Sequence, residues 1–174
     1  MGKDQALKPK PPIYLGFDLG SKSLGIAIRN RLGMIIPLPA WFFPRLDELQ
    51  LSKFILRLIE EHQANALVFG IPFHADGRES DQTAWVLGVV GRLKASVTLP
   101  IKTVDERFTT IEAKERLHEF GLPEKKQKDY IDSVAACIIL EQHERQPRLY
   151  LRNCHGQWQN RNFLYLFYLY LSTW

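Results

Sequence analysis

Apolar and polar positions alternate over the first part of the chain, and this alternation predicts β-strands. Residues 13–18 alternate with a period of two, which is typical of a strand with one buried face. A second apolar run at 24–28 follows closely enough to pair with the first as a hairpin. A third run at 34–43 contains Pro37 and Pro39, which cannot donate hydrogen bonds to a ladder. We therefore expect this third strand to lie at an edge or to contain a bulge.

The pattern then changes to the helical period. Apolar residues recur every three or four positions within 46–62, which predicts an amphipathic helix. Short apolar runs predict two further strands at 66–71 and 101–105, the first of them buried and parallel. The remaining segments are expected to be a loop at 72–81, helices at 82–96, 110–120 and 129–144, and a basic loop at 124–128. This order predicts an α/β fold with a mixed five-stranded sheet flanked by helices.

Length and composition indicate one globular domain with short extensions. The chain has 174 residues, of which 45% are hydrophobic and 24% charged, as in ordinary globular proteins. We expect the domain to span 13–144, with an N-terminal extension at 1–12 and a basic, then hydrophobic, tail at 145–174. The apolar run at 163–171 is too short to cross a bilayer. It either belongs to a tail that docks on the domain or is poorly ordered, or it binds a partner or a lipid surface.

Charge and cysteine content narrow the class further. The formal net charge of +4 permits a polyanionic partner without establishing one. Cys137 and Cys154 cannot form a disulfide framework and lack zinc-finger spacing, so we expect a reducing, cytoplasmic location. Residues 1–12 contain no apolar segment typical of a secretory signal. Membrane-spanning, secreted-scaffold and fibrous classes are thereby excluded.

Carboxylates occur where strands end and where the last helix begins. Asp18 lies near the end of the first strand, Asp105 and Glu106 end the last strand, and Asp132 lies on the final helix. Sites in open α/β sheets form at the carboxyl ends of strands. Acids that converge there repel one another unless a hard cation such as Mg²⁺ or Mn²⁺ neutralises them. A pair of such ions supports phosphodiester hydrolysis. Each acid taken alone could instead have a structural role, as the cap of a turn or a helix.

Four motifs in order give the sequence a family resemblance. They are the segments at 14–28, 69–77, 104–110 and 130–136, which read YLGFDLGSKSLGIAI, FGIPFHADG, VDERFTT and YIDSVAA. With this order and spacing, residues 13–144 resemble the YqgF/RuvX family. The resemblance implies a ribonuclease H-like fold, with three antiparallel N-terminal strands followed by two parallel ones.

The resemblance also implies an activity and a set of acidic residues. Asp18, Glu106 and Asp132 match the metal-binding carboxylates of ribonuclease H-like nucleases, and Asp105 lies beside Glu106 in the acidic pair of the family motif. Which member of that pair is the ligand stays open. The implied function is a two-metal nuclease, using Mg²⁺ or Mn²⁺, that processes the 5′ end of precursor 16S rRNA. Resolution of Holliday junctions in branched DNA is the alternative substrate class.

Several cationic and hydroxyl side chains near these acids are candidates for binding a nucleic-acid backbone. They are Lys22, Arg107, Thr109, Thr110, Lys125 and Lys126. Arginine and lysine suit phosphate groups because they donate charge-assisted hydrogen bonds. Each has an ordinary alternative: solvated lysines, a structural ion pair for the arginine, and a helix cap for the threonines.

Two other functions fit the same sequence. One is a non-catalytic RNA-binding factor in ribosome assembly that keeps a vestigial acidic site. The other is an ATPase, because the segment after Asp18 resembles the phosphate loop of actin-like and sugar kinases. Those kinases need two such domains, and this sequence has the length of one. The sequence leaves open whether the protein is a monomer or a homodimer.

Overall fold

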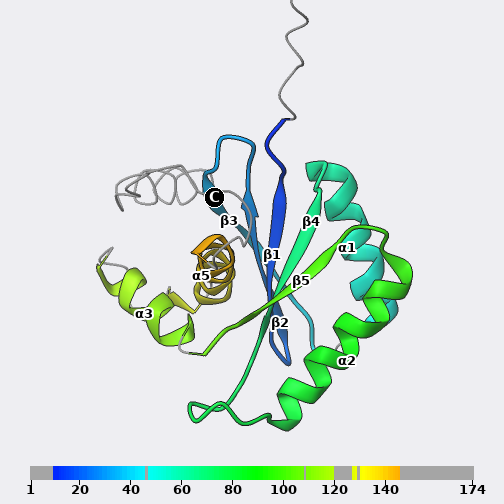
Figure 1. Ribbon diagram of the computed structural model, residues 1–174. Coiled ribbons are helices and arrows are strands. Elements are labelled where there is room, and N and C mark those ends of the chain that lie inside the picture. Colours follow the sequence, from blue (N-terminus) through cyan, green and yellow to red (C-terminus); the bar gives the residue numbers. More distant parts are fainter. Residues whose placement is uncertain (1–9, 46, 108, 120–126, 129, 146–174) are drawn as a thin grey trace, which may run out of the picture.

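The fold is a single mixed sheet with helices on both faces. The computed structural model describes residues 10–45, 47–107, 109–119, 127–128 and 130–145. The elements of this part, in sequence order, are β1 (Tyr14–Leu19), β2 (Ser23–Arg29), β3 (Ile35–Phe42), α1 (Glu48–His62), β4 (Ala66–Ile71), α2 (Asp81–Ser96), β5 (Ile101–Asp105), α3 (Thr109–Glu119) and α5 (Ile131–Arg145). Figure 1 shows them around the central sheet.

The sheet has the strand order β3-β2-β1-β4-β5. Strands β1, β2 and β3 pair antiparallel, whereas β4 pairs parallel with β1 and β5 parallel with β4. This topology confirms the expected ribonuclease H-like fold class. The proline-containing strand β3 lies at an edge, as predicted, and its pairing with β2 shifts register between Leu24 and Ile26. Every residue of β4 is buried, as expected for a central parallel strand.

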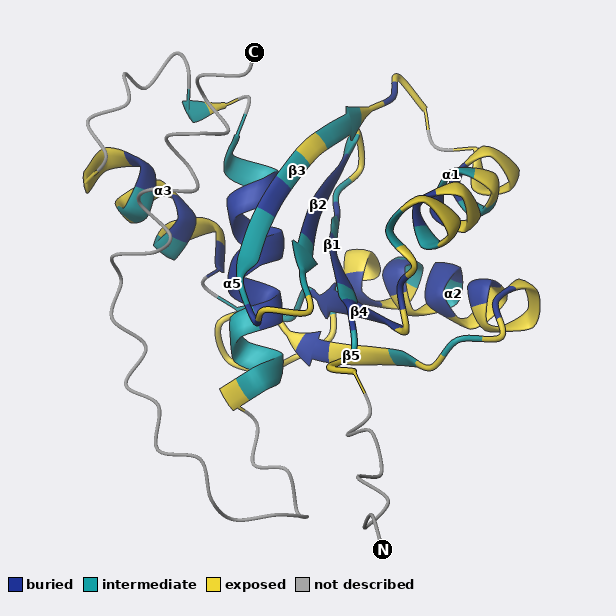
Figure 2. Cartoon of the chain, turned by 90° about the horizontal axis from the view of Figure 1, so that it is seen from above, coloured by how far each residue is buried: buried dark blue, intermediate teal, exposed yellow. Residues whose placement is uncertain are grey.

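The two faces of the sheet carry different helices. Helices α1 and α2 cover one face, and α5 covers the other with α3 packed on its outer side (Figures 1 and 2). Leu15, Phe17 and Leu19 of β1 belong to the larger core, under α1 and α2. Phe17 and Phe69 stack there with ring centroids 4.9 Å apart. Because side chains alternate along a strand, the even-numbered residues of β1 face α5.

Small residues line the side of the sheet under α5. Ala27 and Val68 pack against Ala136, Cys137 and Leu140 of the helix. Cys137 is a buried free thiol, as predicted, and burial raises its pKa well above the usual value. The eight buried residues in the middle of α5 explain why no simple polar face is visible in its sequence. This helix is therefore the core helix of its layer.

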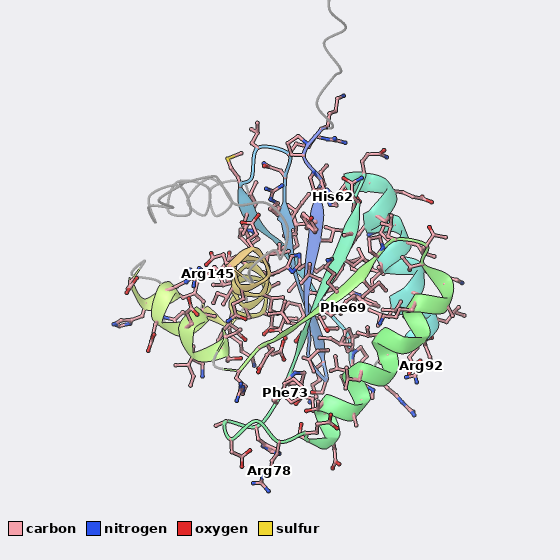
Figure 3. The ribbon with its side chains drawn as sticks, viewed as in Figure 1. His62, Phe69, Phe73, Arg78, Arg92 and Arg145 are labelled. Atoms are coloured by element: carbon pink, nitrogen blue, oxygen red, sulfur yellow. The ribbon has the colours of Figure 1, made fainter. Side chains whose placement is uncertain are left out.

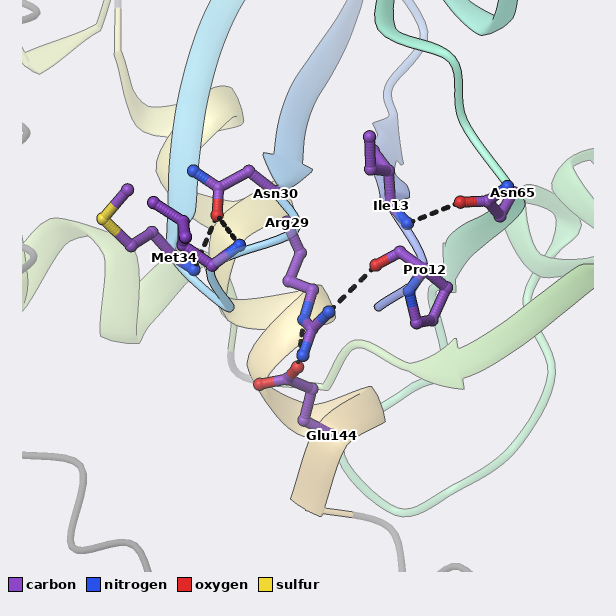
Figure 4. A network of polar contacts seen from close by, with 8 residues as sticks. Pro12, Ile13, Arg29, Asn30, Met34, Asn65 and Glu144 are labelled. Atoms are coloured by element: carbon purple, nitrogen blue, oxygen red, sulfur yellow. Dashed lines mark hydrogen bonds and ion pairs between the residues drawn. The ribbon is translucent and has the colours of Figure 1, made fainter. Parts of the chain in front are cut away.

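A polar network fixes the far end of α5, away from the predicted site. Arg29 donates to Glu144 Oε1 (2.7 Å) and to the Pro12 carbonyl (2.9 Å), and Ile13 N–H donates to Asn65 Oδ1 (2.8 Å) (Figure 4). The Arg29 and Glu144 side chains are only 15% and 26% exposed, so solvent screens this pair less than a surface pair. The network joins the last turn of α5 to the amino end of β1.

The predicted elements agree with the structure except at their ends and at Gln127, which is helical although it falls in the predicted basic loop at 124–128. Helix α2 begins at Asp81 because Ser80 and Thr83 form a reciprocal capping box just before it. Helix α5 spans Ile131–Arg145 instead of 129–144. The predicted loop at 72–81 contains a short antiparallel bridge, described below. Residues 146–174 of the tail, most of the basic loop at 124–128 and Cys154 lie outside the described residues.

Within the described ranges, no helix combines the length and the apolar character that a membrane crossing requires.

Candidate active site

The acidic residues predicted from the sequence gather at the end of the sheet where the parallel strands β1, β4 and β5 have their carboxyl ends. Asp18 is the fifth residue of β1, and Glu106 directly follows the last residue of β5. The Glu106 backbone N–H donates to the carbonyl of Ile71, the last residue of β4 (3.1 Å). This bond anchors Glu106 beside the carboxyl ends of the parallel strands, where sites in such sheets form.

Asp18 lies on the face of the sheet that α5 covers. Gly16, two residues earlier and therefore on the same face, lies against Leu140 so closely that a Cβ atom there would overlap it. Gly25 is paired with Asp18 in the β1–β2 ladder. A Cβ atom at Gly25 would overlap the carbonyl carbon and oxygen of Asp132. The first turn of α5 therefore lies directly on β2, next to Asp18.

Glu106 approaches Asp18 from the opposite side. A Cβ atom at Gly70 of β4 would overlap the Glu106 carboxylate and Ile139 of α5. The order β2-β1-β4 thus places Asp132 over β2, Asp18 on β1 and Glu106 over β4, all on the α5 face. Two glycines, Gly25 and Gly70, make this close approach possible because neither has a side chain.

A buried hydroxyl holds the first turn of α5 against the sheet. Ser133 Oγ donates to the carbonyl of Leu38 in β3 at 2.7 Å, and the Ser133 residue is 1% exposed. Leu38 pairs with Ile26 of β2, beside the register shift at Gly25. Together with the Arg29–Glu144 pair, this bond fixes α5 at both ends. Asp132 consequently belongs to a rigid element, not a loop.

The three acids interact electrostatically. Burial, followed by the nearby charge of Asp132, raises the pKa of Asp18 from 3.8 to about 7. Burial, followed by the charges of Asp18 and Asp105, raises the pKa of Glu106 from 4.5 to about 8. Such shifts mean that the negative charges are poorly solvated and that no cation among the described residues compensates them. Strongly raised carboxyl pKa values at a sheet edge are typical of functional sites.

The donor set fits a hard divalent cation. Glu106 Oε2 is buried without a hydrogen-bond partner within the described part of the chain, and a bound cation would satisfy it. Carboxylate oxygens are the ligands that Mg²⁺ and Mn²⁺ prefer. Over the same residues, no three His, Cys, Asp or Glu side chains already stand close enough to form a metal cluster. The acids approach in pairs, Asp18 with Asp132 and Asp18 with Glu106.

Asp105 and Glu106 differ in their surroundings. The Asp105 carboxylate accepts from Arg107 N–H (3.0 Å) and from Arg107 Nε (2.8 Å), and its side chain is 40% exposed. Glu106 is more buried and faces Gly70 and Ile139. Asp105 is therefore engaged with an arginine, whereas Glu106 is the member of the pair directed under α5.

The predicted nucleic-acid-binding residues fall into different settings. Lys22 is exposed in the turn after β1, where its carbonyl accepts from Phe43 N–H (3.0 Å). Thr110 is exposed in the first turn of α3. Thr109 is 2% exposed, and its hydroxyl donates to the Glu106 carbonyl (2.9 Å), so it stabilises the turn that carries Glu106. Lys125 and Lys126 lie outside the described residues.

Sequence reasoning missed the residues that bring the acids together. Gly25 and Gly70 lie inside the predicted strands at 24–28 and 66–71, where a glycine can mark a bulge or a close approach of another part of the chain. Which segments approach them is recognised only when their neighbours in space are known. The sequence signal that existed was the run of small residues after Asp132, namely Ser133, Ala135 and Ala136. Such a run allows a helix to approach a sheet closely.

The chain is similar in sequence to a known family and to named bacterial proteins. A family model described as "RuvX: Holliday junction resolvase" matches residues 12–144. A Chromobacterium violaceum protein named "Putative pre-16S rRNA nuclease" is 38% identical over 135 residues, which cover 76% of this chain and 97% of that protein. A Coxiella burnetii protein of the same name is 39% identical over 130 residues, covering 75% and 90%.

The similarity to a solved structure is weaker than the similarity to these relatives in sequence. T. thermophilus RuvC in complex with a Holliday junction substrate is 16% identical, with a TM-score of 0.49, over 77% of this chain and 95% of that one. That likeness is too weak to support conclusions about this site. The family match spans most of the sequence and contains the three acids and all described helices and strands except Arg145, the last residue of α5. The chain therefore belongs to the RuvX family.

Proposed function

We propose that this protein is a metal-dependent nuclease that hydrolyses phosphodiester bonds in precursor 16S rRNA. The observation that carries the proposal is the row of Asp132, Asp18 and Glu106 across β2, β1 and β4, in a protein whose relatives are named as nucleases. The raised pKa values of Asp18 and Glu106 support it, because they indicate buried acids whose charge is not compensated by any cation in the described part of the chain.

In this proposal the three acids have distinct tasks. Asp18 and Glu106 hold the divalent cation, Mg²⁺ or Mn²⁺. Asp132 supplies a third carboxylate from the rigid first turn of α5. When bound, one or two such ions activate a water molecule and stabilise the leaving oxygen. Asp105 orients Arg107 through two hydrogen bonds instead of binding metal. The packing of α5 over the acids excludes water from one side, which strengthens their interaction with the cation.

The substrate class has two candidates. The names of the relatives favour precursor 16S rRNA, and the description of the family model favours a four-way DNA junction. Both substrates carry backbone phosphates, so the acidic site suits either chemically. A cytoplasmic location is part of the proposal, since the cysteine content fits a reducing compartment.

The test is a cleavage assay on both substrates with the full-length protein. An RNA fragment spanning the 5′ end of the precursor and a four-way DNA junction are incubated with Mg²⁺, with Mn²⁺ and with a chelator. Asp18→Asn is expected to lower the cleavage rate by about 10³-fold or more, because it removes a charge that acts at the reacting phosphate.

Asp47→Asn is the matched control for this substitution. Asp47 caps α1 on the far side of the sheet, accepting from Leu49 and Gln50 N–H, and asparagine is an equally good cap. This variant is expected to cleave at the wild-type rate. Nucleic-acid binding without any metal-dependent turnover would contradict the nuclease and favour a non-catalytic RNA-binding factor.

A further inference from the structure

Two arginines near the acids are held in the same way. Arg107 donates its backbone N–H to Asp105 Oδ1 (3.0 Å) and its Nε to Asp105 Oδ2 (2.8 Å). Arg78 donates its backbone N–H to Asp76 Oδ1 (3.1 Å) and its Nε to Asp76 Oδ2 (2.7 Å). In both cases an aspartate two residues earlier fixes the guanidinium to its own backbone. The sequence pattern is Asp-x-Arg in each segment.

The two segments meet in space. Arg78 belongs to a hairpin between β4 and α2, closed by the bridge between Phe73 and Glu79 and by the bond from His74 N–H to the Arg78 carbonyl (2.9 Å). Gly77 in its turn has a φ of +85°, and a Cβ atom there would lie 3.3 Å from Arg107 Nη1. The turn of the hairpin therefore lies against the guanidinium of Arg107, which is one residue from Glu106.

The hairpin extends beyond the carboxyl end of the sheet. Figure 3 shows Phe73 near the sheet and Arg78 at the outer end of the hairpin, whereas Arg92 lies on α2, away from this edge. The Arg78 side chain is 80% exposed and that of Arg107 is 37% exposed. Both are accessible to a macromolecular ligand.

Stability does not account for this arrangement. Exposed ion pairs contribute little to folding because water screens them and ordering the side chains costs entropy. Within each guanidinium, only Nε donates a hydrogen bond to the aspartate. In the described part of the chain, the structure records no partner for the Nη nitrogens of Arg78 or Arg107. Two guanidiniums are thus oriented in advance with their outer nitrogens available, which lowers the entropy lost on binding.

The surroundings determine what kind of recognition is available. Asp76, Glu79 and Asp81 are also exposed on or beside the hairpin, so its net charge is not positive. Hydrogen bonds from Arg78 lower the pKa of Asp76, which keeps that carboxylate ionised. A ligand therefore gains from directed hydrogen bonds to the guanidinium and not from a broad positive field. The planar guanidinium matches the oxygens of a phosphate group.

We propose that Arg78 and Arg107 form a two-arginine clamp that binds backbone phosphates of the nucleic-acid substrate beside the acids. The clamp rests on the proposed nuclease function, which supplies the phosphodiester substrate. Arg107 contacts the phosphate nearer the acids, and Arg78 contacts a more distant one along the same strand. Gly77, having no side chain, allows the turn of the hairpin to lie against Arg107 without a side chain covering its guanidinium.

The test measures binding, separately from cleavage. Binding of the RNA fragment and of the four-way DNA junction is measured by fluorescence anisotropy at several salt concentrations, with the Asp18→Asn protein as the non-cleaving background. Adding Arg78→Gln is expected to weaken binding about tenfold and to reduce the slope of log affinity against log salt by about 1. Arg78→Lys keeps the charge but not the planar geometry of the guanidinium. We therefore expect this variant to bind at least about threefold more weakly than the Asp18→Asn parent.

Arg92→Gln is the matched control. Arg92 is also an exposed arginine paired with a carboxylate, Glu48, but it lies on α2 away from the acids. This variant is expected to bind as tightly as its parent, with the same salt slope. Thermal unfolding of each variant verifies that the fold is intact.

The outcomes separate the clamp from the nuclease proposal. If the wild-type protein cleaves either substrate but Arg78→Gln binds like Arg92→Gln, the clamp is wrong and the nuclease stands. If the wild-type protein cleaves neither substrate while Arg78→Gln still weakens binding selectively, the clamp stands and the nuclease is wrong. Full rescue by Arg78→Lys, or no binding by the Asp18→Asn protein at low salt, also contradicts the clamp.

Discussion

Replacing Gly25 by alanine tests how α5 positions Asp132. The added Cβ would overlap backbone atoms of Asp132, which cannot rotate away as the end of a flexible side group does. Restoring ordinary carbon contacts of about 3.5–4.0 Å requires the first turn of α5 to move by between about 1 and 2 Å. Overpacking of this kind costs about 1–3 kcal/mol. A displacement of about 1 Å at a catalytic group lowers rates by about 10²-fold.

The assay combines cleavage rates with thermal unfolding. We expect Gly25→Ala to lower kcat about 10²-fold and to lower Tm by about 2–4 °C for each kcal/mol lost. Gly91→Ala is the control, because Gly91 lies in α2 with nothing within 4 Å of its Cβ position. Alanine there is expected to raise stability by about 0.5–1 kcal/mol without changing kcat. Wild-type cleavage and unchanged Tm for Gly25→Ala would refute the described contact between α5 and β2.

Three further predictions concern the acids and their support. Because the pKa values of Asp18 and Glu106 are about 7 and 8 in the folded protein but near 3.8 and 4.5 when unfolded, the folded state binds more protons between about pH 4 and 8. The metal-free protein should therefore lose stability as pH rises through this window. Added Mg²⁺ should offset the loss most at high pH. A flat profile of Tm against pH would contradict the pKa shifts. Glu106→Gln should abolish cleavage yet stabilise the metal-free protein at pH 8 by about 1–3 kcal/mol, because it removes a poorly solvated charge. Urea unfolding measures this change, and a destabilised variant would count against the explanation. Ser133→Ala leaves the Leu38 carbonyl without its donor, so it should cost about 1–3 kcal/mol in the same measurement, while Ser52→Ala on the exposed side of α1 should cost less.

Much of the fold could be predicted because its elements have distinct periodicities. The alternation at 13–18 and the continuous apolar run at 66–71 predicted β1 and β4, and the two prolines correctly predicted that β3 is an edge strand. The start of α5 was placed two residues early, at 129 instead of Ile131. Periodicity alone cannot determine that position, since the helix is buried along most of its length and its apolar pattern has no clear boundary.

The site could be predicted only in part. Strand ends and the family motifs singled out Asp18, Glu106 and Asp132, and the structure brings them onto one face of the sheet in the order Asp132, Asp18, Glu106. Their roles as metal ligands remain predictions. The contacts that determine their spacing involve residues far apart in sequence, such as the approach of α5 to Gly25. Contacts of this kind depend on how layers pack, which a single sequence does not specify.

The Asp105–Arg107 pair illustrates the same limit. Sequence spacing left open which of Asp105 and Glu106 binds metal, because neighbouring residues at a strand end can turn either way. The hydrogen bonds to Arg107 and the burial of Glu106 distinguish the two only once the turn at Thr109 is known. The hairpin that carries Arg78 looked like an ordinary polar loop, since its closing bridge pairs backbone atoms.

The most direct test of the acidic site is a crystal structure of the full-length protein soaked in Mn²⁺, with anomalous diffraction recorded at the manganese edge. The account predicts an anomalous peak about 2.0–2.4 Å from carboxylate oxygens of both Asp18 and Glu106, on the face of the sheet covered by α5. The Asp18→Asn crystal should show no peak there. Saturating Mn²⁺ with no peak between these two carboxylates, in crystals of a protein that cleaves its substrate, would contradict the account.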